Sequence, residues 1–94
     1  MFIVLLTYRR PLEEVDALIE AHRDWLAPNL AEGVFFLTGR RVPRTGGVIL
    51  AHGLTRAELD RRLAEDPFQA VADYEVIEVA PASVSEHLAF LAKD

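Results

Sequence analysis

The segment that most constrains the fold is residues 2–8, FIVLLTY, which is short, β-branched and almost wholly apolar. A strand without alternating polar residues is usually covered on both faces of its sheet. We therefore expect a central strand, with helices on one face of the sheet. A chain of 94 residues holds a single core, so a second copy of the chain is the expected cover of the other face. The segment thus predicts a homodimer.

A long amphipathic helix is expected to follow this strand. Pro11 suits the first position of a helix, and the acidic residues at 13, 14 and 16 favour its N-terminal end. Apolar residues then recur at helical spacing, namely Leu12, Val15, Leu18, Ile19, Trp25, Leu26 and Leu30. Gly33 supplies a stop, so the helix is predicted to run from Pro11 to about Ala31.

The remaining elements complete an alternating order. Strands are predicted at residues 34–39, 47–52 and 74–80, and a long hairpin loop joins the first two of these. Thr55 and Glu58 match the capping-box pattern, which predicts a helix over residues 56–64. The order βαββαβ predicts an α+β, ferredoxin-like fold in which both helices cover one face of an antiparallel sheet.

The chain is predicted to consist of a domain at residues 1–80 and a C-terminal tail at residues 81–94. Pro81 ends the last strand. In the tail, Val84, Leu88 and Leu91 fall on one side of a short predicted helix. We expect this helix to lie on a partner subunit, at the dimer interface.

Composition excludes several classes of function. The net charge of −5 argues against nucleic acid as a partner. The chain has no cysteine, which rules out disulfides and zinc fingers and fits a reducing cytoplasm. Its start does not resemble a signal peptide, and no stretch approaches membrane-spanning length. We expect a cytoplasmic protein that begins at Met1 and does not bind membranes.

His22, in the segment AHRDWL, lies near the centre of the apolar face of the predicted helix. A buried neutral imidazole still presents one donor and one acceptor, so it needs a polar partner. One possible partner is a backbone carbonyl, which would make His22 a structural core residue. The other is Asp66, which also fits a helix N-cap because Pro67 follows it. If Asp66 reaches His22, the pair can transfer protons near neutral pH.

Tyr8, Arg40 and Arg44 are the predicted substrate-binding residues. The two arginines lie with Arg41 at the hairpin loop, where the three either form a solvated tip or bind an anionic ligand. His52 and His87 have no metal-ligand spacing with His22 and are expected at the surface. We therefore expect a small-molecule ligand and no metal or redox cofactor.

Several motifs together resemble the YCII-related (YciI-like) family. They are MFIVLLTY, the AHRDWL helix, the TG...VPRTGGVILA hairpin, the EDPF turn and the YEVIEV strand, over about residues 1–80. The resemblance implies a dimeric α+β barrel of ferredoxin-like subunits, with a cleft that holds a His-Asp pair at His22 and Asp66. The chain departs from this pattern at Arg40, where many relatives have proline, and in the tail after Pro81.

One branch of this family is implied to eliminate chloride from a chlorinated hydroxyhydroquinone. The leading hypothesis is therefore a small cytoplasmic enzyme, lyase-like or dehydrochlorinase-like, that uses His22 and Asp66 for acid–base chemistry such as elimination or isomerisation. Two alternatives remain open. One is a non-catalytic, small-molecule-binding or accessory dimeric domain, and the other is a purely structural dimer module.

Overall fold

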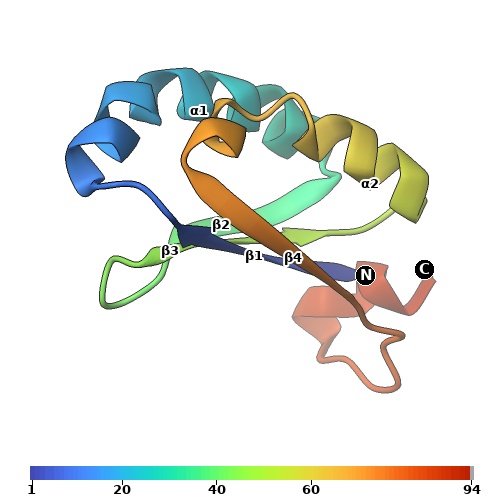
Figure 1. Cartoon of the computed structure of the whole chain (residues 1–94). Coiled ribbons are helices and arrows are strands. Elements are labelled where there is room, and N and C mark those ends of the chain that lie inside the picture. Colours follow the sequence, from blue (N-terminus) through green and yellow to red (C-terminus); the bar gives the residue numbers. More distant parts are fainter. Residues whose placement is uncertain (94) are drawn as a thin grey trace.

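The structure is a computed structural model that describes residues 1–93. A four-stranded antiparallel sheet carries two α-helices on one face (Figure 1). The strands are β1 (Phe2–Tyr8), β2 (Phe35–Arg40), β3 (Gly46–Ala51) and β4 (Ala72–Glu78). The helices are α1 (Leu12–Glu32), α2 (Arg56–Leu63) and two 3-10 helices, η1 (Pro67–Ala70) and η2 (Glu86–Lys93).

The strand order β2-β3-β1-β4 places β1 between two antiparallel neighbours. This order, with both α-helices on one face, confirms the predicted ferredoxin-like α+β fold. The strand bounds differ slightly from the prediction. The strands expected at 34–39, 47–52 and 74–80 instead occupy 35–40, 46–51 and 72–78.

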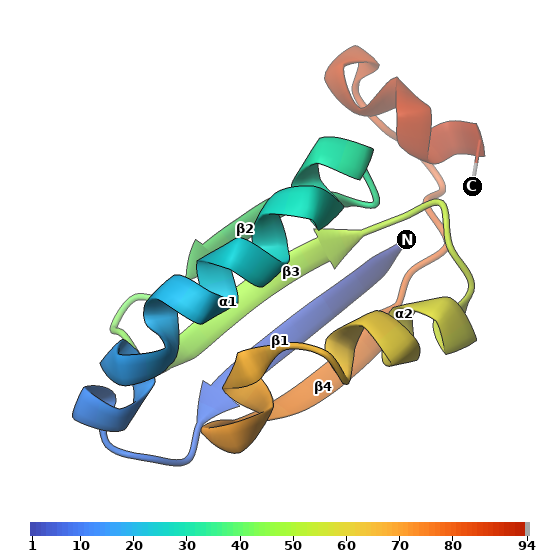
Figure 2. The same ribbon diagram turned by 90° about the horizontal axis from the view of Figure 1, so that it is seen from above.

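Both α-helices begin and end close to where the sequence signals place them. Gly33 adopts the left-handed conformation (φ 85°) that ends α1, and Pro11 occupies its N-cap position. At α2, the Thr55 hydroxyl accepts the Glu58 N–H (3.1 Å), and the Glu58 carboxylate accepts the Thr55 N–H (3.0 Å). The predicted capping box is therefore confirmed. Figure 2 shows α1 lying over β2 and β3, roughly along the strands, and α2 lying over the β1 and β4 side of the sheet.

The two faces of β1 have different surroundings. Phe2, Val4 and Leu6 point to the helices and are at most 6% exposed, whereas Ile3 and Leu5 on the other face are only half-buried. The helix-covered face forms the core with residues such as Phe35 and Leu59. The other face of the sheet, which we call the open face, is partly exposed in the single chain.

A β-bulge in β2 decides which residues of that strand face the helices. Phe35 pairs with Ala51, but the next pairs are Leu37 with Leu50 and Thr38 with Ile49. Strict alternation from Phe35 would direct even-numbered residues to the open face. The extra residue reverses this, so Thr38 and Arg40 share the helix-covered face with the core residue Ile49.

Gly46 of the hairpin lies too close to β1 for any side chain to fit. A Cβ atom on Gly46 would lie 1.7 Å from the carbonyl oxygen of Leu6, because β3 approaches β1 closely there. No larger residue fits at this position without displacing backbone. The close pairing of β1 and β3 is thus sufficient to explain Gly46.

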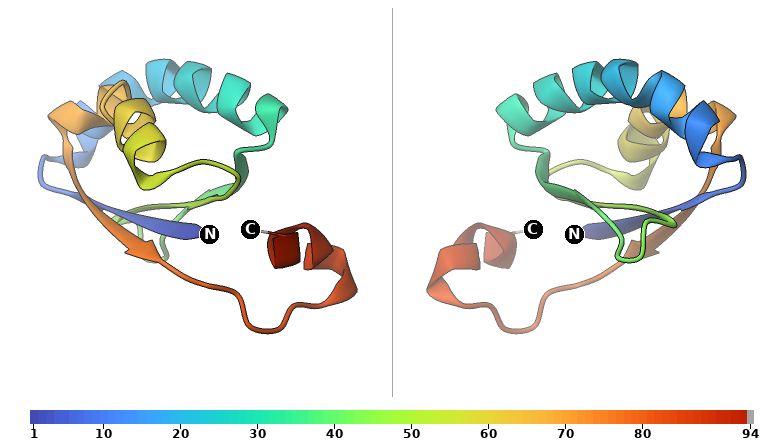
Figure 3. Two further views of the ribbon diagram at one scale, coloured as in Figure 1. Left: turned by 90° about the vertical axis from the view of Figure 1, so that its right-hand side faces the viewer. Right: turned by 90° about the vertical axis from the view of Figure 1, so that its left-hand side faces the viewer.

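The C-terminal segment lies beyond the end of the sheet, as the view from above shows (Figure 2). Figures 1 and 3 show η2 on the side opposite α1 and α2. The ring of Phe90 lies 5.2 Å from that of Phe36 and 4.8 Å from that of His52, and Leu91 is buried. His52 is therefore half-buried by aromatic rings, whereas His87 is exposed as expected.

No helix within residues 1–93 is both long enough and apolar enough to cross a bilayer.

Candidate active site

His22 lies on the side of α1 that faces the sheet, and its side chain is only 12% exposed. Its ring is stacked on that of Phe68, with the centroids 3.8 Å apart and an interplanar angle of 2°. His22 Nδ1 is 2.7 Å from Asp66 Oδ1. Packing and a hydrogen bond therefore hold the ring in one orientation.

Asp66 is fully buried at the start of η1, and three donors surround its carboxylate. The Phe68 N–H donates to Oδ1 (2.9 Å), the Tyr74 hydroxyl donates to Oδ2 (2.5 Å), and His22 supplies the third contact. The two roles considered for Asp66 are thus not alternatives, since it caps η1 and binds His22 at once. The backbone-carbonyl partner considered for His22 is not the one observed.

This arrangement has a consequence for the tautomer of His22. A carboxylate can only accept hydrogen bonds, so the proton between it and His22 resides on Nδ1. The other ring nitrogen, Nε2, is then the one with a free lone pair in the neutral ring. The geometry thus assigns Nε2 as the nitrogen able to exchange a proton with a bound molecule.

The Tyr74 hydroxyl is a lasting hydrogen-bond donor to the Asp66 carboxylate. Burial raises the pKa of Tyr74, and its hydrogen bond to Asp66 and the negative charge of that residue raise it further. The hydroxyl therefore remains protonated at physiological pH. Nothing in the local pattern of YEVIEVA marked this tyrosine, because only the path of β4 beside η1 brings it to Asp66.

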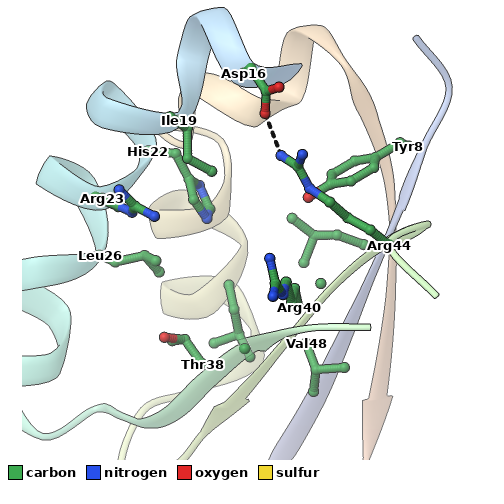
Figure 4. A pocket seen from close by; sticks show the side chains of 14 residues that line it. Tyr8, Asp16, Ile19, His22, Arg23, Leu26, Thr38, Arg40, Arg44 and Val48 are labelled. Carbon is green, nitrogen blue, oxygen red and sulfur yellow. Dashed lines mark hydrogen bonds and ion pairs between the residues drawn. The ribbon is translucent and has the colours of Figure 1, made fainter. Parts of the chain in front are cut away.

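A cavity of about 510 Å³ opens beside His22. It lies between α1 and the hairpin end of the sheet, as Figure 4 shows. Tyr8, His22, Arg40 and Arg44 all line it, whereas Asp66 lies behind His22 and does not. The structure thus brings together the four predicted residues that border the cavity. Its apolar walls include Leu6, Ile19, Leu26 and Ile49.

The arginines of the hairpin loop differ in their surroundings. Arg44 pairs with Asp16 of α1 at 2.5 Å, and this contact raises the pKa of the guanidinium. Arg41 does not line the cavity and instead donates to the Thr7 hydroxyl at 3.0 Å. Arg40 points into the cavity from the bulged strand. Arg44 is therefore paired rather than solvated, whereas Arg40 is exposed at the mouth of the cavity.

Sequence reasoning did not identify four further residues of this region. Phe68 stacks on His22, Tyr74 binds Asp66, and Arg23 and Asp16 line the cavity. Arg23 follows His22 in the chain, and Phe68 lies two residues after Asp66. This closeness in sequence to a predicted site residue is the only signal that could have identified them. Within residues 1–93, no three His, Asp or Glu side chains gather in a way that could hold a metal ion.

Comparison with known proteins agrees with this description. The model of the YCII-related domain matches residues 1–83, which confirms the resemblance derived from the motifs. A search of curated proteins found no match. Among solved structures, the chain is similar to a 5-chloro-2-hydroxyhydroquinone dehydrochlorinase from Burkholderia phenoliruptrix AC1100, in complex with 2,5-dihydroxybenzoquinone. The TM-score is 0.69 at 18% identity, over 93% of this chain and 98% of that one, which establishes a shared fold.

Proposed function

The chain belongs to the YCII-related domain family, and from this premise we propose that it is a small acid–base enzyme. His22 exchanges a proton with a small molecule in the cavity, and Asp66 holds the imidazole in position. Tyr8, Arg40 and Arg44 contact the substrate. The reaction is of the elimination or isomerisation type, for which no metal or redox cofactor is needed.

The observation that carries this proposal is the contact between His22 and Asp66 at the edge of a cavity. A histidine that only fills a core has no need of both a buried carboxylate and an adjoining space for a ligand. Here one nitrogen is bound to Asp66, and the ring also lines a cavity of about 510 Å³. That volume lies in the range typical of small-molecule sites.

The structurally similar dehydrochlorinase suggests a first reaction to test. Loss of HCl from 5-chloro-2-hydroxyhydroquinone removes two hydroxyl protons and returns one to the carbon that carries chlorine. Chloride then leaves as the ring becomes a quinone, so no outside oxidant is required. A residue that both accepts and donates protons, as His22 does in this proposal, suits each of these steps.

The test is chloride release from 5-chloro-2-hydroxyhydroquinone by the wild type, His22→Gln and Asp66→Asn. We expect kcat/KM to fall about 100-fold or more in His22→Gln, because general acid–base catalysis typically contributes that much. Asp66→Asn should lose less, since the amide oxygen can still accept from Nδ1. His87→Gln, which changes an exposed histidine, is the matched control and should retain full activity.

The urea unfolding midpoint of each variant shows whether its fold is retained. Folded His22→Gln protein with undiminished turnover would exclude the mechanism. Binding of 2,5-dihydroxybenzoquinone without turnover of the chlorinated compound, or of related hydroquinones and lactones, would instead favour a non-catalytic binding or accessory domain.

We propose further that the protein is a homodimer that works in the cytoplasm. One cross-strand row of apolar residues lies on the open face, formed by Ile3, Leu37, Leu50 and Ile77. Two of them are clearly exposed, Leu37 by 48% and Ile77 by 39%. A second copy packed on the open face would cover this row, and the tail from Pro81 onward would then lie at the dimer interface. Sedimentation should give a dimer for the wild type and a monomer for Leu37→Glu, and a monomeric wild type would contradict the proposal.

A further inference from the structure

The arginines of this chain fall into two groups. Most have a partner, since Arg9, Arg10, Arg44, Arg56 and Arg62 pair with carboxylates and Arg41 donates to a hydroxyl. Within residues 1–93, Arg23, Arg40 and Arg61 form no hydrogen bond or ion pair. Two of these three, Arg23 and Arg40, line the cavity beside His22.

The two unpaired arginines reach the cavity from different elements. Arg23 comes from α1, next to His22 in the chain, and Arg40 comes from the end of β2. The β-bulge directs Arg40 to this face of the sheet, where it lies opposite Gly47. Figure 4 shows the His22 ring between these two guanidinium groups. Two positive charges therefore border the same cavity as His22, and both arginines are exposed enough to meet a ligand there.

No acidic residue of the cavity is left to neutralise them. The lining contains three arginines and one aspartate, and that aspartate, Asp16, already pairs with Arg44 at 2.5 Å. This local excess of positive charge occurs in a chain whose net charge is −5. A concave site with unpaired guanidinium groups and apolar walls attracts a small anion with a carbon skeleton.

We propose that the cavity binds an organic carboxylate, with its anionic group held by Arg23 and Arg40. The acid–base part rests on the function proposed above, because the reacting atom of this ligand would then lie at His22 Nε2. A carboxylate fits better than a phosphate, since the planar fork of a guanidinium matches it and the site has no glycine-rich phosphate loop. Arg44 contributes less, because Asp16 already occupies its guanidinium.

The experiment compares three probes that share one ring, which are benzoate, benzamide and phenyl phosphate. Binding is followed by NMR through backbone amide and arginine Nε–H signals, at about 50 mM salt to limit screening. We expect benzoate to shift the signals of Arg23 and Arg40 and to bind about tenfold more tightly than neutral benzamide. If phenyl phosphate binds more tightly than benzoate, the preferred ligand is a phosphate ester and not a carboxylate. That result would overturn this part of the proposal.

Three arginine variants locate the binding site. Arg23→Gln and Arg40→Gln should each weaken benzoate binding about fivefold and leave benzamide binding unchanged. Arg61→Gln removes the same charge from an unpaired arginine that does not line this cavity, so it should have no effect. Asp16→Asn should strengthen benzoate binding, because it frees Arg44.

The same measurements on His22→Gln separate this inference from the proposed function. If that variant binds benzoate normally, the anion site exists whether or not His22 is catalytic. Equal binding of benzoate and benzamide, or benzoate binding that is unchanged in both Arg23→Gln and Arg40→Gln, would overturn the inference. Absence of detectable binding by all three probes would overturn it as well.

Discussion

Two polar contacts join α1 to the segment that follows β3, and they differ in what remains unsatisfied. Near the end of α1, the buried Asn29 donates to the Trp25 carbonyl (2.9 Å) and accepts from Arg62 (2.7 Å). Arg62 also pairs with Glu32 at 2.7 Å. In the middle of α1, His22 uses only one of its two ring nitrogens, on Asp66, and lines a cavity.

The difference separates a structural contact from a candidate reactive one. At Asn29, each polar group has a partner and the charge of Arg62 is balanced by Glu32, so the contact only ties α1 to α2. At His22, a fully satisfied carboxylate orients a ring whose second nitrogen is left for a ligand. A buried polar pair indicates function when it leaves a reactive atom beside a cavity, rather than through burial alone.

Replacing Asp66 by Ala should have the largest effect. The change leaves the His22 Nδ1–H, the Phe68 N–H and the Tyr74 hydroxyl without an acceptor in a buried place. We expect a loss of about 3 kcal/mol in the free energy of unfolding, measured by urea denaturation. A loss below that of Arg62→Ala would show that the two contacts have been ranked in the wrong order.

Replacing Tyr74 by Phe should have an intermediate effect. Asp66 Oδ2 loses its donor while the carboxylate stays buried, which should cost about 1.5 kcal/mol of unfolding free energy. The tautomer of His22 should persist, because Oδ1 still accepts from Nδ1. Nitrogen-15 chemical shifts of the ring would reveal this, and a switch of the proton to Nε2 would mean that Tyr74 contributes to orienting the histidine.

Replacing Arg62 by Ala tests the contact at Asn29, in which each polar group has a partner. We expect a loss of about 1 kcal/mol, because the buried Asn29 oxygen loses its donor, whereas Arg62 and Glu32 are partly exposed and water replaces part of their interaction. Turnover should be unchanged, since Arg62 does not line the cavity. A drop in kcat without a change in stability would remove the distinction drawn between the two contacts.

The smallest expected effect is the pH dependence of this ion pair. Its hydrogen bond and attraction to Arg62 lower the pKa of Glu32 from its ordinary value of 4.5. A lowered folded-state pKa adds stability that is present above pH 4.5 and is lost as the pH falls through the lower folded value. The stability difference between wild type and Glu32→Gln should therefore narrow on acidification. A difference that widens would contradict this assignment.

Much of the framework could be predicted because its causes are local. The capping box at Thr55, the stop at Gly33 and the apolar run at 2–8 each depend on neighbouring residues, and each is found where expected. The site was predicted in part. Helical periodicity predicts His22 on the inner face, and Asp66 is a candidate partner because its turn follows the second helix and because the family resemblance implies a His-Asp pair. Tyr74 and Arg23 were not identified, since their roles depend on which elements lie beside them.

The sequence by itself determined the order of the elements and the side of α1 that carries His22, because periodicity and capping act over a few residues. The tertiary structure alone decided that one carboxylate serves a cap, a histidine and a tyrosine together. It also decided, through the bulge in β2, that Arg40 turns toward the cavity, and that the tail packs against Phe36 and His52 of its own chain. The physical reason is that these outcomes depend on strand register and on contacts between distant segments, which alternation along one strand does not encode.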